Sequence, residues 1–225
     1  YGVSAKSAEG SARVTVGDTV VVAGVKVEMS ATYPDTPDEG TIMVNAELLP
    51  LSSPEYESGP PGIDAVELSR VVDRGIRESK ALDFNKLCVR AGEKMWIVMI
   101  DIYPLNASGN LFDVASLAAL AALKDTRFPA VGEKDAIDYK HKTDKGLPLS
   151  FLPVSCTVWR VGDQFIVDPT RDEELAADAR LTVSFTESGK ICAMQKGGNR
   201  PFTHEEVFQA IDLAQRKTEE LRKSL

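Results

Sequence analysis

Residues 67–79 read Glu-Leu-Ser-Arg-Val-Val-Asp-Arg-Gly-Ile-Arg-Glu-Ser, a pattern that predicts an amphipathic helix. At about 100° per residue, the apolar side chains of such a helix share one face. These residues are Leu68, Val71, Val72 and Ile76. Three arginines lie on the opposite face, within about 60° of one another. They are Arg70, Arg74 and Arg77, and we call them the arginine face.

The arginine face has two interpretations. Guanidinium groups bind phosphates through two parallel hydrogen bonds, so the stripe could hold a nucleic-acid backbone. Alternatively it is a solvated surface, because Glu67, Asp73 and Glu78 flank it and can pair with the arginines. The pattern alone leaves both open.

Upstream of this helix, residues 13–16 and 19–27 read as two strands joined by a tight Gly17-Asp18 turn. Residues 41–49 alternate apolar and polar side chains and predict a third strand. We expect the helix itself over residues 64–79, with Asp64 as its cap. A second hairpin follows over residues 87–90 and 95–103. Asp113 is then expected to cap an Ala- and Leu-rich helix that ends near Leu123, and this helix is apolar all round, so it must be buried.

Residues 128–149 are polar and rich in Lys and Asp, which favours a connection between domains. Four strands are expected beyond it, over residues 152–160, 164–168, 181–186 and 190–195. A last helix begins after Thr203 with a capping box. Helices follow groups of strands, which predicts an α+β fold in two pseudo-related βα halves. The predicted organisation is a subdomain over 1–128, a connection over 129–149 and a subdomain over 150–225.

Charge and cysteine content restrict the function. The chain of 225 residues holds 26 Lys and Arg against 34 Asp and Glu, a net charge of −8. This balance argues against a free-standing nucleic-acid binder, because phosphate contacts need a basic surface. The three cysteines form no CxxC pair, which indicates a reduced, cytoplasmic protein. No apolar run is long enough for a membrane span.

An acidic run, residues 168–174, is followed by Asp178. Paired carboxylates at such spacing are the ligands that Mg²⁺ or Mn²⁺ prefers. The same run also reads as an acidic turn between two strands. His141 and His204 have no second ligand at helical spacing, so histidine ligation of a metal is not expected.

Several stretches together resemble the RNase PH superfamily, the fold of phosphorolytic 3′→5′ exoribonucleases and exosome ring subunits. They are residues 9–14, 17–26, 34–37, 40, 67–79 and the pair Gly109-Asn110. The similarity covers essentially the whole chain and implies an RNase PH-like fold in both subdomains. A basic segment of the family would precede Tyr1. Residues 79–83 and 166–169 resemble the non-catalytic ring subunits of archaeal exosomes in particular.

The chain departs from the catalytic pattern at its carboxylates. Catalytic members carry an aspartate six residues after the position of Asp168, and another six residues further on. These positions hold Glu174 and Arg180 here. An arginine repels Mg²⁺ and cannot donate a proton at neutral pH. Asp172 and Asp178 are also six residues apart, so a two-residue shift of register would restore a carboxylate pair.

Two phosphate-binding positions of the family also lack their cation. Catalytic members have an arginine just before the first helix, where this chain has residues 62–66 without a cation. They carry Gly-(Thr/Ser)-Arg where this chain has Gly109-Asn110-Leu111. The resemblance thus implies an inactive protomer with no catalytic residue, metal site or cofactor of its own. Phosphate, with Mg²⁺ as a further candidate, would bind in a catalytic partner.

The resemblance also implies a role for the arginine face. Arg74 and especially Arg77 would bind RNA phosphates at the subunit boundary, with Arg70 as a third contact. The chain would pair with a catalytic RNase PH-type subunit, and three such pairs would form a six-membered ring that S1/KH RNA-binding cap subunits cover. Two alternatives stay open: a self-sufficient phosphorolytic exoribonuclease that uses Asp172, Asp178 or Glu174, and a scaffold without RNA contact.

Overall fold

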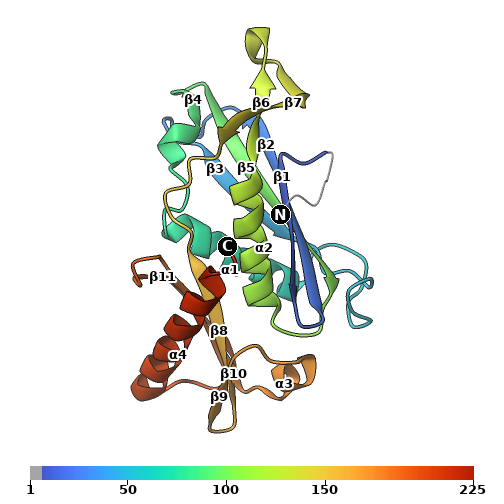
Figure 1. Ribbon diagram of the computed structural model, residues 1–225, viewed down its shortest axis with the longest axis vertical. Helices are drawn as coiled ribbons and strands as arrows, with labels where there is room; N and C mark the ends of the chain where they lie inside the picture. Colours follow the sequence, from blue (N-terminus) through green and yellow to red (C-terminus); the bar gives the residue numbers. More distant parts are fainter. Residues whose placement is uncertain (1–6) are drawn as a thin grey trace.

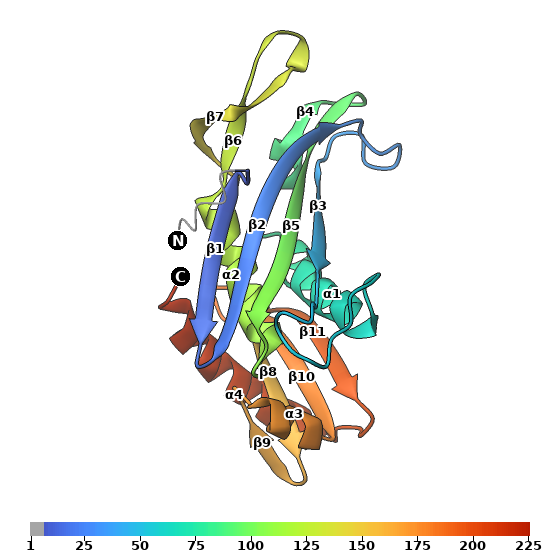
Figure 2. The ribbon, with the colours of Figure 1, turned by 90° about the vertical axis from the view of Figure 1, so that its right-hand side faces the viewer.

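A five-stranded sheet forms one outer layer of the protein (Figures 1 and 2). The computed structural model describes residues 7–225, apart from the side chain of Lys134. The strand order is β1-β2-β5-β3, with β4 paired to β5. The strands are β1 (Gly10–Val16), β2 (Thr19–Ser30), β3 (Thr41–Ala46), β4 (Cys88–Arg90) and β5 (Lys94–Asn106). Only the β3–β5 pair is parallel among these.

Local sequence explains the hairpin at the start of this sheet. Gly17 turns the chain between β1 and β2 with φ at +55°, a conformation that glycine adopts without steric cost. Along β2, residues alternate between buried and half-buried over most of the strand. The buried set therefore forms one continuous apolar face, which α2 covers.

Two helices lie between the first sheet and a second one. They are α1 (Ile63–Glu78) and α2 (Leu111–Asp125). The second sheet has the order β11-β10-β8-β9. Its strands are β8 (Val154–Val161), β9 (Gln164–Ile166), β10 (Ala179–Phe185) and β11 (Ile191–Gly198). Helix α2 contacts β1, β2 and β8, and α1 contacts β3 and β11, so the helix pair is the central layer.

A long helix at the end of the chain, α4 (His204–Arg222), covers the outer side of the second sheet along β8 and β10 (Figure 1). It begins with the predicted capping box, in which Thr203 and Glu206 exchange hydrogen bonds. A small core of Cys156, Val158, Val183 and Phe185 lies between this sheet and α4. The larger core lies between the first sheet and α2.

The central layer meets the second sheet through hydroxyl groups rather than through apolar side chains alone. Ser155 and Ser184 lie 2.7 Å apart, and Thr157 lies 2.9 Å from Thr182. The Thr157 hydroxyl also donates to Asp113 of α2 at 2.8 Å. All these groups are buried, so each needs its partner. This interface places the candidate site described below.

The predicted α+β class is confirmed, with corrections at two helix starts. Asp64 does not cap α1, because the cap residue is Gly62 and Asp64 lies within the first turn. Asp113 does not cap α2 either. That helix begins three residues earlier than a cap at Asp113 predicts, after Asn110 in the left-handed conformation, and Asp113 is buried.

The acidic run is neither a plain turn nor a metal site in this structure. It contains a short helix, α3 (Arg171–Ala176), which follows a capping box between Thr170 and Glu173. Its acidic residues complement the positive end of the helix dipole. None of the residues of α3 is buried, so this helix contributes no apolar face to the core.

The predicted connection contains a β-hairpin that projects from the body of the molecule (Figures 1 and 2). Its strands are β6 (Arg127–Val131) and β7 (Ile137–Gly146). Most residues of β7 are exposed, so the strand lacks the alternation that predicts one. The subdomain boundaries stay a prediction. In the part of the chain that the structure describes, no helix is long and apolar enough to cross a membrane.

Candidate functional site

Arg70 and Arg74 lie together on the exposed side of α1. Both line a surface hollow of about 550 Å³, whose other walls include Ile63, Val66 and Gln195. They also share a smaller hollow of about 250 Å³. Arg74 donates a hydrogen bond to the Gln195 Oε1 atom of β11 at 3.0 Å. Two adjacent cations beside concave surface can hold consecutive phosphates of a chain.

Arg77 has a different environment, although it belongs to the same face. Its guanidinium forms two hydrogen bonds with the Asp73 carboxylate, at 2.8 and 2.9 Å. It also donates to the Ile42 carbonyl of β3 at 3.0 Å. The hydrogen bond with Asp73 is the main cause that raises the pKa of Arg77. The structure thus brings Arg70 and Arg74 together and ties Arg77 to Asp73 and β3.

A second hollow, of about 230 Å³, lies where α1 and α2 begin. Four of its lining residues come from the positions at which the resemblance implies a departure from catalytic members. They are Asp64, Leu111, Glu174 and Arg180. These residues are far apart in the sequence and meet only through the packing of the helix layer on the second sheet. We call this the arginine-lined hollow.

Arg180 lines this space from β10. Its guanidinium pairs with the Glu67 Oε2 atom at 2.5 Å and lies 4.6 Å from the centre of the Phe112 ring. The Trp159 ring is 5.4 Å away, which encloses the cation between two aromatic rings. The side chain is only 14% exposed. A side chain at Gly197 would place its Cβ atom 2.4 Å from the Arg180 guanidinium carbon, so this glycine makes room for the cation.

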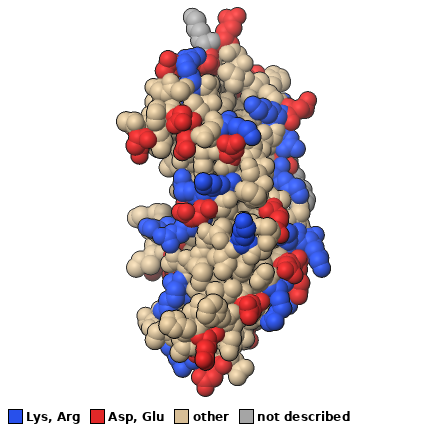
Figure 3. Space-filling model, turned by 90° about the vertical axis from the view of Figure 1, so that its left-hand side faces the viewer, with Lys and Arg blue, Asp and Glu red and all other residues tan. Residues whose placement is uncertain are grey.

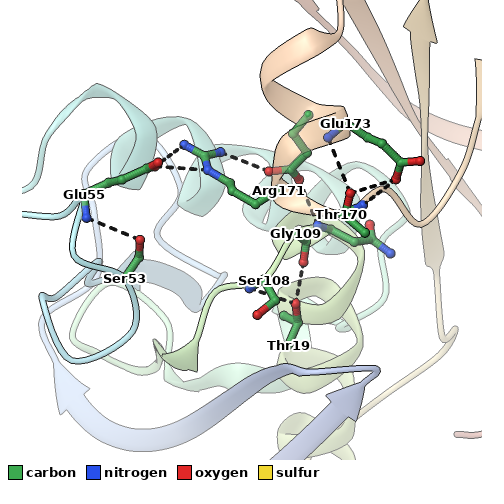
Figure 4. Close-up of polar contacts among 10 residues, drawn as sticks. Thr19, Ser53, Glu55, Ser108, Gly109, Thr170, Arg171 and Glu173 are labelled. Atoms are coloured by element: carbon green, nitrogen blue, oxygen red, sulfur yellow. Dashed lines mark hydrogen bonds and ion pairs between the residues drawn. The ribbon is translucent and has the colours of Figure 1, made fainter.

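Glu174 has a structural role in the same hollow. One carboxylate oxygen accepts the Asn110 amide at 2.8 Å, and the other pairs with Arg171 at 3.0 Å. Arg171 also pairs with Glu55 at 2.6 Å, which ties the loop before α1 to α3 (Figure 4). Beside them Gly109, at φ +118°, lies so close to Pro169 that a Cβ atom would be 2.2 Å from the proline carbonyl.

The other carboxylates of the acidic run, and Asp178 after it, lie outside the arginine-lined hollow. Asp168 accepts a hydrogen bond from the Asn110 side chain at 2.7 Å. Asp178 accepts from the Gly162 amide and lies 3.4 Å from Arg200. Asp172 is exposed on α3. Within residues 7–225, no group of three or more His, Cys, Asp or Glu side chains is arranged to hold a metal ion.

Sequence reasoning missed the partner of Arg180. It assigned Glu67 to the flank of the arginine face, whereas the carboxylate pairs with β10. It also assigned no role to Trp159 or Tyr56, which line the same hollow. No local spacing relates these residues, because they come from separate elements.

Family models match both halves of the chain. The first domain of the 3′ exoribonuclease family, RNase PH, matches residues 1–129. The second domain of the same family matches residues 152–217. The chain belongs to the RNase PH family.

Several relatives within the RNase PH family are named exosome complex component Rrp42. The one from Methanopyrus kandleri is 45% identical, over 97% of this chain and 82% of its own length. The one from Methanocella arvoryzae is 47% identical over the same shares. The predicted resemblance to archaeal exosome ring subunits is therefore confirmed at the level of sequence.

Solved structures agree with the RNase PH fold. A chain of the Archaeoglobus fulgidus exosome with RNA bound to the active site matches with a TM-score of 0.89 at 46% identity, covering 96% of this chain and 83% of that chain. A chain of an archaeal exosome core gives 0.86 at 42% identity, covering 98% and 83%. The predicted RNase PH-like fold is confirmed.

Proposed function

We propose that this chain is a non-catalytic subunit of an exosome ring and pairs with a catalytic RNase PH-type subunit for 3′→5′ phosphorolytic RNA degradation. One observation carries the inactive role. The positions at which the resemblance implies catalytic carboxylates and phosphate-binding arginines line one hollow, where the Arg180 guanidinium lies between Glu67 and two aromatic rings. The similarity to exosome components supports the assembly.

The chemistry of the hollow is unsuited to phosphorolysis. A permanent cation at Arg180 disfavours a divalent metal at that position and cannot act as a general acid at neutral pH. Glu174 already accepts two hydrogen bonds from its neighbours. Asp64 and Leu111 offer no cation to attacking phosphate. Phosphate, and Mg²⁺ as a candidate, would bind in the partner subunit.

The arginine face supplies the proposed contribution to RNA binding. Arg70 and Arg74 are exposed, and Arg77 keeps N–H groups beyond those bound to Asp73 and Ile42. Contacts to phosphates position a chain without reading its sequence. We therefore place RNA along α1, with S1/KH cap subunits as further partners, in the cytoplasm.

The decisive experiment compares the chain alone, its catalytic partner alone, and the mixture. Release of nucleoside diphosphates from RNA and phosphate is the readout. We expect activity from the mixture and none from this chain, together with a native mass that corresponds to three pairs. Activity of the isolated chain that disappears in Asp172→Asn or Asp178→Asn would overturn the proposal and support the self-sufficient enzyme.

A further inference from the structure

The guanidinium group of Arg77 is held in one orientation by its neighbours. Its Nε and Nη2 atoms donate to the two carboxylate oxygens of Asp73, at 2.9 and 2.8 Å. Nη2 also donates to the Ile42 carbonyl of β3 at 3.0 Å, and the centre of the Phe84 ring lies 5.9 Å from the guanidinium carbon. A two-point ion pair fixes the plane of the guanidinium as well as its place. The cation is therefore oriented before any ligand arrives.

These contacts leave the Nη1 atom of Arg77 for a ligand. Nη1 forms no hydrogen bond with a described residue. Solvent reaches it, because Asn110 Oδ1 and Trp159 Nε1 are the buried polar side-chain atoms without a partner in residues 7–225. The Arg77 side chain is 40% exposed. Nη1 carries two N–H donors, so this end of the guanidinium can bind an anionic oxygen while the other end stays bound to Asp73.

Asp73 lies among the cations of the arginine face. It lines the hollow of about 250 Å³ that Arg70 and Arg74 share, and its side chain is 25% exposed. A carboxylate at this place repels a phosphate, so charge alone disfavours it on a surface that binds RNA. Its printed geometry offers a compensating effect. Both of its oxygens bind Arg77, which stands one helical turn further along α1.

We propose that Asp73 is a positioning residue for RNA, which holds Arg77 so that Nη1 donates to a phosphate of the RNA strand. This inference rests on the proposed function, because it assigns how the arginine face binds RNA. A side chain that is ordered beforehand loses less freedom on binding, and the affinity rises by that difference. The orienting effect of Asp73 on Arg77 then outweighs the repulsion between its carboxylate and the phosphates.

The proposal predicts an effect of opposite sign from that of charge alone. Asp73→Asn removes one negative charge, which by itself would tighten RNA binding. It also removes one of the two oxygens that hold Arg77, so we expect weaker binding. Glu78→Gln is the matched control. Glu78 is exposed and adjacent to Arg77 in the sequence, and its carboxylate forms no hydrogen bond or ion pair with a described residue. The two variants thus lose the same charge from the same helix.

The experiment measures binding of a labelled single-stranded RNA to the ring assembled from this chain and its catalytic partner, by fluorescence anisotropy at about 0.15 M salt. Glu78→Gln should bind as tightly as the unchanged ring or slightly more tightly. Asp73→Asn should bind roughly three- to tenfold more weakly than Glu78→Gln, the range expected when one long side chain must be ordered on binding. Asp73→Glu keeps both acceptor oxygens and should restore most of the affinity. Native mass establishes that each variant assembles.

RNAs with single neutral methylphosphonate linkages separate positioning from a general distortion of α1. The linkage opposite Arg77 is the one whose replacement weakens binding to the unchanged ring but not to Arg77→Ala. In Asp73→Asn this linkage should lose its effect, while the linkages that Arg70 and Arg74 contact keep theirs. A distorted helix would instead weaken the effect of every linkage.

Two results would overturn the role of Asp73 and leave the RNA contact of Arg77 intact. One is an affinity of Asp73→Asn equal to or higher than that of Glu78→Gln, and the other is a loss spread evenly over all linkages. If Arg77→Ala binds RNA like the unchanged ring, both this inference and the RNA contact proposed for Arg77 are wrong. Arg77→Ala therefore distinguishes failure of the proposed function at this residue from failure of the positioning role.

Discussion

Arg180 places a cation where the resemblance to catalytic RNase PH members implies a carboxylate. Its cation is held by Glu67 and by two aromatic rings, with 14% of the side chain exposed. At this depth the ion pair is strengthened by the low local dielectric, and a lone charge is destabilising. These contacts also join α1, α2 and β10.

Arg180→Ala should lower the free energy of unfolding by about 2–3 kcal/mol, because it leaves Glu67 unpaired and removes packing on Phe112 and Trp159. Urea denaturation measures this loss. Arg70→Ala, at an exposed position, should stay within about 0.5 kcal/mol of the unchanged chain. Equal effects of the two substitutions would contradict the role given to Arg180.

Asp113 makes stability depend on pH. Because burial raises its pKa to about 7, the folded state keeps a proton that the unfolded state releases near pH 4. This contribution to stability is fully present below about pH 4 and is lost as the pH rises to about 7.

Asp113→Asn should remove this loss, so the variant gains stability over the unchanged chain as the pH rises from 4 to 7, by on the order of 3 kcal/mol. An asparagine can still accept the Thr157 hydrogen bond. Unfolding in urea at several pH values measures the difference. Parallel pH profiles for the two proteins would refute this account.

Helix α1 carries arginines in two different environments, one exposed and one half-buried. Arg70 and Arg74 are exposed and lie beside concave surface, whereas Arg77 is half-buried against Asp73 and β3. Exposed cations contribute little to folding, so we expect substitutions of Arg70 and Arg74 to change ligand binding more than stability.

Arg74→Ala in the assembled ring should lower the salt slope of RNA binding by about one and leave stability unchanged. Arg77→Ala should lower the same slope and also destabilise the chain by about 1 kcal/mol, because it breaks a two-point ion pair and the bond to Ile42. Arg216→Ala on α4 is the control. An unchanged slope in both variants would favour a scaffold without RNA contact.

The whole molecule carries its charges mixed. On the face in Figure 3, Lys and Arg side chains are interspersed with Asp and Glu instead of forming one basic patch. With a net charge of −8, the chain alone attracts a phosphate backbone weakly. The net charge therefore disfavours RNA binding by the isolated chain, but not by an assembly in which partners add cations.

The isolated chain should therefore bind single-stranded RNA far more weakly than the mixture with its catalytic partner, by at least tenfold at about 0.15 M salt. Fluorescence anisotropy with a labelled oligonucleotide measures both. The partner alone is the necessary comparison. Micromolar affinity of the isolated chain, equal to that of the mixture, would contradict this expectation.

Local patterns predicted the elements whose form depends on neighbouring residues. The β1–β2 hairpin follows from its Gly17 turn, and the two faces of α1 follow from a periodicity of 3.6. The start of α4 follows from a capping box. Predictions that rested on a single residue, such as the caps at Asp64 and Asp113, were wrong, because the neighbouring loop residues Gly62 and Asn110 set the helix starts.

Some features of the candidate site were likewise predicted from the sequence, and others appear only in the tertiary structure. The sequence predicted that three arginines share one helix face, and the family resemblance implied that Arg180 stands where catalytic relatives have a carboxylate. Only the tertiary structure joined Arg180 to Glu67, tied Arg77 to Asp73 and Ile42, and buried Asp113 against Thr157. The physical reason is that periodicity and turn chemistry act between neighbours along the chain, whereas burial and ion pairing depend on how separate layers pack against each other.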